Sequence, residues 1–372
     1  MAQSNDKESD QDLGEMESEE GFTFPPSERK VITQPIDLSI QTLVDQWKAN
    51  IIILPEIQRE YLWDNGKASR LIESLLLNIP IPVLYFAETQ EAKYEIIDGH
   101  QRVQSIARFF SNEFALSGLA VLRENYGGLR HHKLPERDQR FLKMRTLRAI
   151  IISVDSHPTM KFEIFERLNT GSISLNAQEL RNSIFRGSFN KLLRRLALNE
   201  TFRVIMGTRH PRKRMVDEEL VLRFFALRDT LNTYRPPLKR VLNNYMDAVK
   251  ALDDSAIAAY ETSFVSTINR VQRLIGNNAF RLTDSNGKPL ESAVNRALFD
   301  AQMLTAAWTD DNGTRASDVL RQLSKLNTSP EFLDAIQRAT GDRSRTLKRV
   351  RDTVEAFRLA GLTVNVPYDL SK

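Results

Sequence analysis

The first half of the chain alternates short apolar runs with segments whose apolar residues recur every three or four positions. The short runs are typical of strands, and the longer spacing is typical of helices. The pattern predicts strands at residues 51–54, 83–87, 94–97 and 147–154. It predicts helices at residues 37–50, 67–78, 103–110 and 137–145. This order of elements indicates a mixed domain of strands and helices.

Beyond about residue 160 the pattern is almost entirely helical. The predicted helices span 160–168, 176–187, 188–199, 215–231, 238–251, 254–276, 289–308, 315–326, 330–338 and 344–360. The fold class is therefore α+β: a small mixed-sheet domain followed by an all-α domain. We place the boundaries at 1–30 for an acidic disordered tail, 31–190 for the sheet domain and 191–372 for the helical domain.

Charge is distributed unevenly along the chain. The formal net charge is +4, but residues 1–20 contribute −7, so the remainder carries +11. A basic folded body favours an anionic partner such as a nucleotide or DNA. The chain has no cysteine, which excludes disulfides and thiolate chemistry and agrees with a reducing cytoplasm. No apolar run approaches the roughly 20 residues of a membrane helix, so we expect a cytoplasmic protein without a membrane partner.

The turn from Asp98 to Arg102 joins a predicted strand to a predicted helix. The first N–H groups of a helix have no intrahelical acceptor, and the helix dipole favours an anion there. Gly99 lets the backbone approach a ligand, and Arg102 offers a planar fork to phosphate oxygens. Asp98 is a candidate metal ligand, although an ordinary role as helix cap explains it equally simply.

Three other segments concentrate polar and aromatic groups. Their members are Gln58, Arg59, Tyr61 and Trp63 in the first; Asn169, Thr170 and Gly171, followed by Glu179, Arg181 and Asn182, in the second; and Arg209, Arg212, Lys213 and Arg214 in the third. The first suits stacking on a base and pairing with phosphate, but it also suits packing over a sheet edge. The second is a donor-rich turn before a capping box, and the third is a candidate DNA-backbone contact or a solvated loop.

Several chemistries are excluded by missing motifs. The sequence contains neither a Walker phosphate loop nor a Gly-x-Ser-x-Gly elbow, and its five histidines lack the zinc-protease spacing. His131 and His132 form a weaker catalytic candidate.

Together the segments Pro-x-x-Gln-Arg-x-Tyr-x-Trp, Ile-Asp-Gly-x-Gln-Arg and Arg-Leu-Asn-Thr-Gly with Glu-Leu-Arg-Asn occur in an order that resembles one family. The family is the N-terminal domain of GmrSD-type, modification-dependent restriction endonucleases, in the ParB/sulfiredoxin-like superfamily. The resemblance covers residues 35–190. The chain resembles a standalone member, because the His-x-x-Pro and trailing Asn pattern of an HNH nuclease is missing after residue 200.

The resemblance implies NTP binding with Mg²⁺ and NTP hydrolysis in defence against phage carrying modified DNA. Carried over, Asp98, His100 and Arg102 would be catalytic, with Asp98 as metal ligand. The nucleotide-binding residues would be Gln58, Arg59, Tyr61, Gly99, Gln101, Asn169 and Thr170. His100 departs from the family pattern, which usually has Gln, and can act as acid or base or contact phosphate.

Three functions follow from these observations. The first is an NTP-hydrolysing restriction component that senses DNA and acts with an effector nuclease. The second is a metal-dependent DNA nickase that uses Asp98 with His100. The third is a non-catalytic regulator whose DNA affinity is switched by nucleotide. The sequence leaves open which nucleotide and DNA modification are recognised and whether the chain forms a homo-oligomer.

Overall fold

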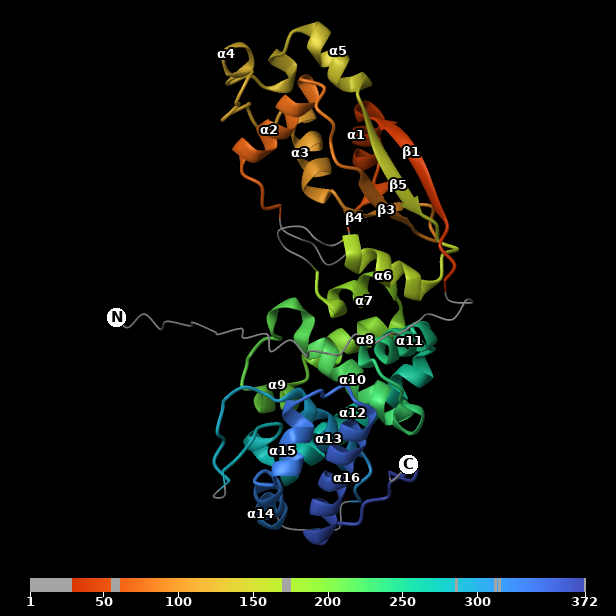
Figure 1. The fold of residues 1–372 in the computed structure, drawn as a ribbon, viewed down its shortest axis with the longest axis vertical. Coiled ribbons are helices and arrows are strands. Elements are labelled where there is room, and N and C mark those ends of the chain that lie inside the picture. Colours follow the sequence, from red (N-terminus) through yellow and green to blue (C-terminus); the bar gives the residue numbers. More distant parts are fainter. Residues whose placement is uncertain are drawn as a thin grey trace, which may run out of the picture. The chain divides into compact units, whose positions relative to one another are not determined.

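The computed structural model describes residues 29–54, 61–168, 175–284, 287–310, 313 and 316–370 (Figure 1). The chain divides into two compact units, of which the first ends at Phe185 and the second begins at Arg186. Within the described residues, no helix is both long and apolar enough to cross a membrane.

The N-terminal unit contains a mixed five-stranded sheet. Its strands are β1 (Thr33–Ser39), β2 (Ile52–Ile53), β3 (Leu84–Glu88), β4 (Tyr94–Asp98) and β5 (Thr146–Ile152), in the spatial order β1-β5-β3-β4-β2. The β1–β5 and β3–β4 pairs are antiparallel, whereas β3–β5 and β2–β4 are parallel. The helices of this unit are α1 (Ile40–Lys48), α2 (Asn65–Leu76), α3 (His100–Phe110), α4 (Arg123–Tyr126), η2 (His131–Lys133), α5 (Glu136–Met144), α6 (Pro158–Leu168) and α7 (Ala177–Ile184).

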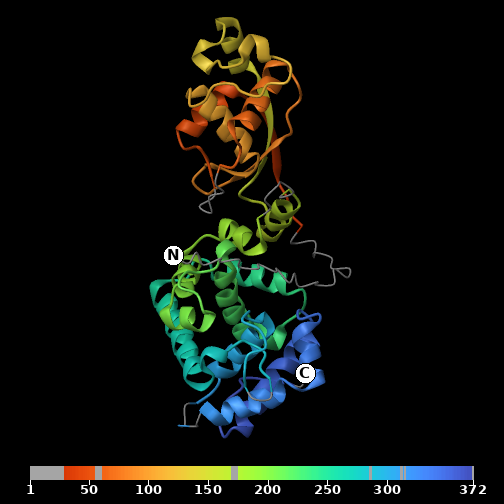
Figure 2. The same ribbon diagram turned by 90° about the vertical axis from the view of Figure 1, so that its left-hand side faces the viewer.

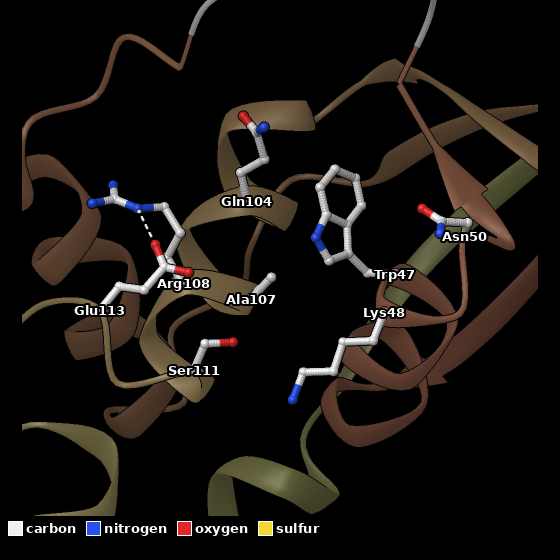
Figure 3. A pocket seen from close by; sticks show the side chains of 8 residues that line it. All are labelled: Trp47, Lys48, Asn50, Gln104, Ala107, Arg108, Ser111 and Glu113. Carbon is white, nitrogen blue, oxygen red and sulfur yellow. Dashed lines mark hydrogen bonds and ion pairs between the residues drawn. The ribbon is translucent and has the colours of Figure 1, made fainter.

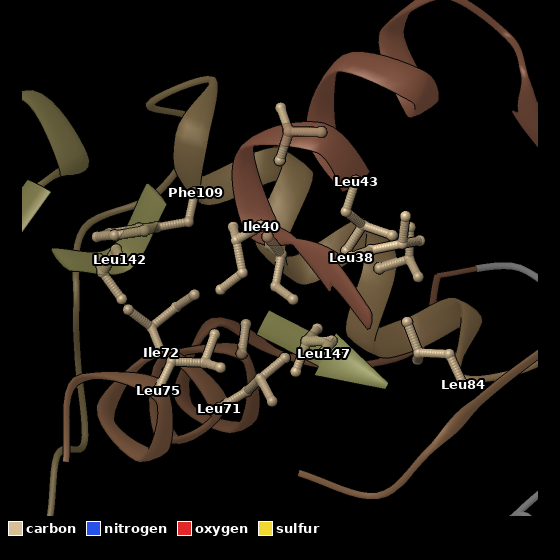
Figure 4. Close-up of a cluster of buried hydrophobic side chains, with 14 of the residues drawn as sticks. Leu38, Ile40, Leu43, Leu71, Ile72, Leu75, Leu84, Phe109, Leu142 and Leu147 are labelled. Carbon is tan, nitrogen blue, oxygen red and sulfur yellow. The ribbon is translucent and has the colours of Figure 1, made fainter. Parts of the chain in front are cut away.

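Alternate residues of the strands face opposite sides of this sheet. Phe86 and Ile96 belong to a core that includes apolar side chains from α1, α2 and α3, part of which Figure 4 shows. Glu95, one position before Ile96, points to the other side, where the Ser183 hydroxyl of α7 donates to its carboxylate at 3.1 Å. The central residues of β4, Glu95, Ile96 and Ile97, are therefore buried although they face both sides of the sheet.

The first predicted helix, 37–50, is too long at its N-terminal end. The helix begins at Ile40 because the Ser39 hydroxyl caps it by accepting the Thr42 N–H at 3.0 Å. The preceding residues form β1, which the sequence pattern did not predict. Pro35 is compatible with this strand because β1 lies at the sheet edge.

Glu73 of α2 is a buried carboxylate that binds backbone. Its oxygens accept the N–H groups of Ala120, Val121 and Leu122 at 3.0, 2.7 and 2.8 Å. Burial by itself raises the pKa of Glu73. Together these hydrogen bonds lower the pKa by more than burial raises it, so the pKa lies below its usual value. The charged side chain therefore fixes the loop before α4 against α2.

The C-terminal unit is helical, as the sequence predicts (Figures 1 and 2). Its helices are α8 (Ser188–Ala197), α9 (Glu200–Met206), α10 (Val216–Thr230), α11 (Leu238–Val249), α12 (Asp254–Leu274), α13 (Arg296–Ala307), α14 (Ala316–Leu326), α15 (Pro330–Gln337) and α16 (Arg343–Leu359), with the short turns η3 (Lys213–Met215), η4 (Leu231–Thr233) and η5 (Gly276–Asn278). The α+β fold class is confirmed: a small mixed sheet is followed by helices. The short helix α9 was not predicted, and α13 begins seven residues later than its predicted start at residue 289, because the side chain of Asn295 caps it.

Candidate functional site

The turn between β4 and α3 requires glycine. Gly99 has φ +98°, and it occupies the N-cap position of α3 without a side-chain cap. A Cβ atom at this position would lie 2.4 Å from Leu84 Cδ2 and 3.2 Å from an Arg102 nitrogen. Left-handed backbone and close packing therefore both exclude a larger residue. Asp98 is consequently not the helix cap that its position suggests.

Arg102 holds this turn against the segment that leads into β3. One guanidinium nitrogen donates to Asp98 Oδ2 at 2.7 Å, and the other donates to the carbonyl oxygens of Pro82 and Val83. The Arg102 side chain is 12% exposed and that of Asp98 is 36% exposed. Burial lowers the pKa of Arg102, an effect that the nearby Asp98 carboxylate partly offsets. Solvent thus reaches the carboxylate side of the pair.

Gln101 joins the turn to residues that lie about forty positions earlier. Its Oε1 accepts the backbone N–H groups of Leu62 and Trp63 at 3.1 and 3.2 Å. Since the oxygen faces these two donors, Nε2 faces His100 and donates to His100 Nε2 at 2.8 Å. The accepting ring nitrogen carries no proton in this arrangement, so the proton of the neutral imidazole is on Nδ1.

Tyr61 is held against the same helix. The Ser105 hydroxyl donates to the Gln101 carbonyl at 2.7 Å, so the Tyr61 hydroxyl, 2.9 Å from Ser105 Oγ, is the donor to it. The guanidinium carbon of Arg108 lies 4.4 Å from the centre of the Tyr61 ring. Tyr61 therefore packs on α3, and not over the sheet edge that the structural alternative for this segment expects.

Four predicted nucleotide-binding residues, Gln58, Arg59, Asn169 and Thr170, lie outside the described residues. The segment that follows the second pair begins α7 with the predicted capping box. The Asn176 side chain accepts the Glu179 N–H at 2.8 Å, and Glu179 accepts the Asn176 N–H at 2.7 Å. Arg181 and Asn182 in the same helix are buried, so they support the packing of α7.

Asp98 provides one carboxylate for a metal ion. Within the described residues, no group of three His, Asp or Glu side chains is arranged to hold a metal. Mg²⁺ bound together with a nucleotide often takes only one or two protein carboxylates and completes its shell with phosphate and water. The donor set therefore fits a nucleotide-borne Mg²⁺ at Asp98 better than a metal held by protein alone.

The basic run in the C-terminal unit divides into exposed and inward-facing cations. Arg209, Lys213 and Arg214 are exposed. Arg212 instead donates through its backbone N–H and its side chain to Asp217 at 2.7 and 2.9 Å.

Asp217 is completely buried and also accepts from Arg203 at 2.8 Å. Burial by itself raises the pKa of Asp217. The adjacent Arg212 and Arg203 together lower the pKa by more than burial raises it, so the pKa lies below its usual value. Asp217 therefore clamps the loop that displays the outer cations.

The two side chains of the pair His131–His132 have different surroundings. The His131 ring is buried and stacks on Phe110, with ring centres 4.4 Å apart. Burial, followed by the charges of Lys143, His132 and Lys48, lowers the pKa of His131. His132 Nδ1 lies 2.7 Å from the Asn112 side-chain oxygen at the surface.

A cavity on the side of α3 that packs near α1 was not predicted. It has a volume of about 390 Å³ and contains Trp47 and Gln104 among its lining residues (Figure 3). The helical pattern places Trp47 on the apolar face of its helix. It therefore predicts a core residue and not a residue that lines a cavity. Gln104 stands beside the apolar positions 103, 106, 107 and 110 of α3, and the sequence contains no signal that marks it as a cavity residue.

Comparison with known proteins identifies the N-terminal unit. Residues 40–186 match the family described as the GmrSD restriction endonuclease, N-terminal domain. No curated protein and no solved structure gives a significant match. The match contains the turn at Asp98–Arg102, the Tyr61 segment and α7. The domain formed by residues 40–186 is a member of the GmrSD restriction endonuclease N-terminal domain family.

Proposed function

We propose that this protein is an NTP-binding and NTP-hydrolysing component of a bacterial, modification-dependent restriction system directed against phage. In this role it senses DNA and acts with a partner effector. Membership of the GmrSD N-terminal family suggests a part in a restriction system. The nucleotide, its hydrolysis and the effector are the finer parts of the proposal.

The hydrogen bonds of Gln101 carry the nucleotide assignment. Through Leu62 and Trp63 they bring the end of the Gln-Arg-x-Tyr-x-Trp segment to the first turn of α3. Gln58 and Arg59 immediately precede this anchored end in the sequence. Two motifs that are about forty residues apart in the sequence thus lie next to each other. If each motif only stabilised its own turn, the two would not need to be adjacent.

The proposed phosphate position is the N-terminal end of α3. The helix dipole and the first backbone N–H groups favour an anion there, and Gly99 keeps the backbone clear of side-chain bulk. Arg102 adds positive charge beside a carboxylate that solvent reaches. Asp98 would hold a Mg²⁺ that accompanies the phosphates, and that ion would supply neutralisation of phosphate charge. Gln101 orients the imidazole of His100 for proton transfer.

The DNA-sensing part of the proposal rests on the C-terminal unit. Exposed Arg209, Lys213 and Arg214 lie in one short loop whose conformation is fixed by buried Asp217. A fixed basic loop suits contacts with the phosphate backbone, which depend on charge more than on sequence.

A nucleotide panel tests this proposal. Calorimetry with ATP, GTP, CTP and UTP in the presence of Mg²⁺ should detect binding of at least one nucleotide. Arg102→Ala should abolish that binding. Arg148→Ala removes an exposed arginine of β5 that pairs with Asp37 of β1, and it should leave the binding unchanged. Thermal melts of both variants separate a local effect from unfolding. Undiminished binding by Arg102→Ala would contradict the site assignment.

Phosphate release, measured with and without modified DNA, tests hydrolysis. Release that DNA stimulates supports the proposed enzyme. Binding without release, together with a nucleotide-dependent change in DNA affinity, supports the regulator. Nicking of plasmid with Mg²⁺ or Mn²⁺ and no nucleotide supports the nickase.

A further inference from the structure

Helix α5 exposes apolar and basic side chains together on one side. Its exposed residues Arg137, Arg140, Phe141 and Met144 recur at the spacing of three and four that places side chains on the same side of a helix. We call these four residues the α5 face. Phe141 is 42% and Met144 77% exposed, whereas Leu142 belongs to the core. The helix thus packs inward through Leu142 and leaves the α5 face open to solvent.

Arg145 connects the α5 face to the end of α2. Its guanidinium carbon lies 4.5 Å from the centre of the Phe141 ring, and its Nε donates to the carbonyl oxygen of Leu75 at 3.2 Å. Leu77 and Ile79 follow Leu75 closely in the sequence, and their side chains are also exposed. Two segments therefore contribute apolar side chains to this surface, which is a common feature of interaction sites.

The surroundings of the α5 face are positively charged. Residues 130–145 contain six lysine or arginine residues and two carboxylates, a net charge of +4. Glu136, one of these carboxylates, already pairs with Arg140 at 3.2 Å. Arg137 and Lys143 form no ion pair within the part of the chain that the structure describes. The surface is therefore suited to an anionic partner that also carries apolar side chains.

The N-terminal end of the same chain has this chemistry. Residues 6–20 contain eight carboxylates and one lysine, a net charge of −7. Leu13 and Met16 lie among these acids, separated by three positions. The segment therefore complements both the positive charge and the exposed apolar side chains of the α5 face.

The connecting residues are long enough to bring this segment to α5. Glu20 precedes Thr33, the first residue of β1, by thirteen positions, which span up to about 43 Å when extended. β1 runs from Thr33 to Ser39, and Ser39 pairs with Thr146, two positions after Met144. A strand of this length covers roughly 23 Å, so the connecting residues can return along β1 to the α5 face. This path lies within the N-terminal unit, to which Thr33 and Met144 both belong.

We propose that residues 6–20 bind the α5 face of the same chain and compete there with other anions. Their carboxylates neutralise the unpaired cations, and their two apolar side chains cover the exposed apolar ones. The connection to β1 provides an effective concentration on the order of 1 mM, so weak individual contacts suffice. The proposed contact does not depend on the proposed function, because it requires neither a nucleotide nor the turn at Asp98–Arg102.

Disulfide formation tests the contact in the full chain. The chain has no cysteine, so two introduced thiols are the only ones present. Ser18→Cys with Met144→Cys places one thiol in the acidic segment and one on the α5 face. Ser18→Cys with Gln90→Cys is the control, because exposed Gln90 lies just after β3, at the end of the sheet where β1 begins. An acidic segment that binds nowhere would meet position 90 more often than position 144.

Under mild oxidation at low salt, we expect the disulfide to position 144 to form about tenfold faster than the disulfide to position 90. The difference should shrink at about 1 M NaCl, because screening then reduces the Debye length to about 3 Å. Each rate is divided by the rate at which the same thiols react with a small disulfide, which corrects for differences in thiol pKa.

Charge variants of the fast pair show which cations carry the contact. Arg137→Gln with Lys143→Gln removes the two unpaired cations, so it should lower the rate to that of the control pair. Lys93→Gln with Arg148→Gln removes two cations of the same unit that pair with carboxylates elsewhere, and it should leave the rate unchanged. Thermal melts of both variants separate loss of the contact from unfolding.

Binding of a short DNA duplex at low salt measures the competition. Replacing four carboxylates by amides changes the net charge of residues 6–20 from −7 to −3; the substitutions are Asp10→Asn, Asp12→Asn, Glu15→Gln and Glu17→Gln. This variant should bind the duplex several-fold more tightly, and the gain should disappear when Arg137→Gln and Lys143→Gln are added. A gain that survives their addition would indicate general repulsion of DNA and would overturn competition at α5.

Equal rates for the two thiol pairs, or a faster control pair, would overturn the proposed contact. Cross-linked dimers in place of disulfides within one chain would assign the acidic segment to a second copy and would overturn it as well. Neither result changes the expectation for nucleotide binding, which Arg102→Ala tests separately.

Discussion

The N-terminal unit contains an arginine–carboxylate pair that solvent reaches, and the C-terminal unit contains one whose carboxylate solvent does not reach. Arg102 pairs with Asp98, whose side chain is 36% exposed. Arg212 pairs with Asp217, whose side chain is 0% exposed and which also binds Arg203. An exposed carboxylate can exchange its partner for water or a ligand at small cost, whereas a buried one cannot. Asp98 is therefore suited to contact a ligand, and Asp217 is suited to holding its own loop.

Removing the two carboxylate charges should separate the pairs most clearly. Asp217→Asn leaves Arg203 and Arg212 around a neutral amide, so we expect the free energy of unfolding of the C-terminal unit to fall by about 3–5 kcal/mol. Asp98→Asn should lower the stability of the N-terminal unit by about 1 kcal/mol or less. Urea unfolding of the full chain measures both, and equal losses would contradict the comparison.

Adding a side chain beside the Arg102–Asp98 pair should have the next largest effect on the free energy of unfolding. Gly99→Ala introduces a Cβ in left-handed backbone against Leu84 and beside Arg102, so we expect a loss of about 2–4 kcal/mol. Gly128→Ala is the matched control, because Gly128 has φ +82° but nothing within 4 Å of the added Cβ. Its loss should be limited to the backbone part, about 1–2 kcal/mol. A loss at position 99 no greater than at position 128 would show that the contact with Leu84 is unimportant.

His131 extends the comparison to a buried ionisable group that lacks a carboxylate. Its pKa in the folded protein is lowered, so the unfolded chain takes up a proton at higher pH than the folded chain does. Stability should therefore be complete above the usual histidine pKa of 6.5 and should decline as the pH falls below it.

His131→Phe keeps an aromatic ring on Phe110 and removes this titration. The variant should lose less stability than the unaltered protein between pH 6.5 and 5, as measured by urea unfolding at each pH. His132→Phe, at the exposed neighbouring position, should keep the original pH dependence. Parallel pH profiles for the unaltered protein and His131→Phe would exclude this role.

The smallest effect on stability is expected from the outer cations of the basic loop. Arg209→Gln and Lys213→Gln should each change the free energy of unfolding by less than about 0.5 kcal/mol. If the loop contacts DNA, each substitution should also make the fall of log affinity with log salt concentration less steep, by about 1 in the slope. Arg212→Gln should do the reverse and destabilise the unit with little change in slope. A slope that responds to Arg212 but not to Lys213 would reverse our assignment of the two classes.

The sequence predicted most helices because a buried helical face repeats every three or four residues. It missed β1, which is an edge strand containing Pro35 and whose buried face shows only Ile36 and Leu38. The pattern instead extended the following helix back to residue 37. Edge strands are exposed on much of their surface, so they have little apolar alternation to detect.

The candidate site shows a similar limit. The sequence identified the residues of the turn at Asp98–Arg102, but it could not show that Gln101 binds the backbone of residues 62 and 63. It grouped Arg212 with Arg209 and Lys213, because a run of cations does not reveal which one faces a buried carboxylate. Such distinctions depend on partners brought close by folding, and local periodicity contains no information about them.

Glu73 makes the two sides of one contact differ in how freely they can mutate. It binds three backbone N–H groups, which any residue except proline would supply, so the side chains at 120–122 can drift without affecting the contact. Glutamine would turn an NH₂ group toward these donors, and aspartate is one methylene shorter, so neither near-isostere serves at position 73. In a comparison of diverged sequences we therefore expect an invariant residue opposite a variable loop. Covariation methods, which need both partners to change, would not detect this contact.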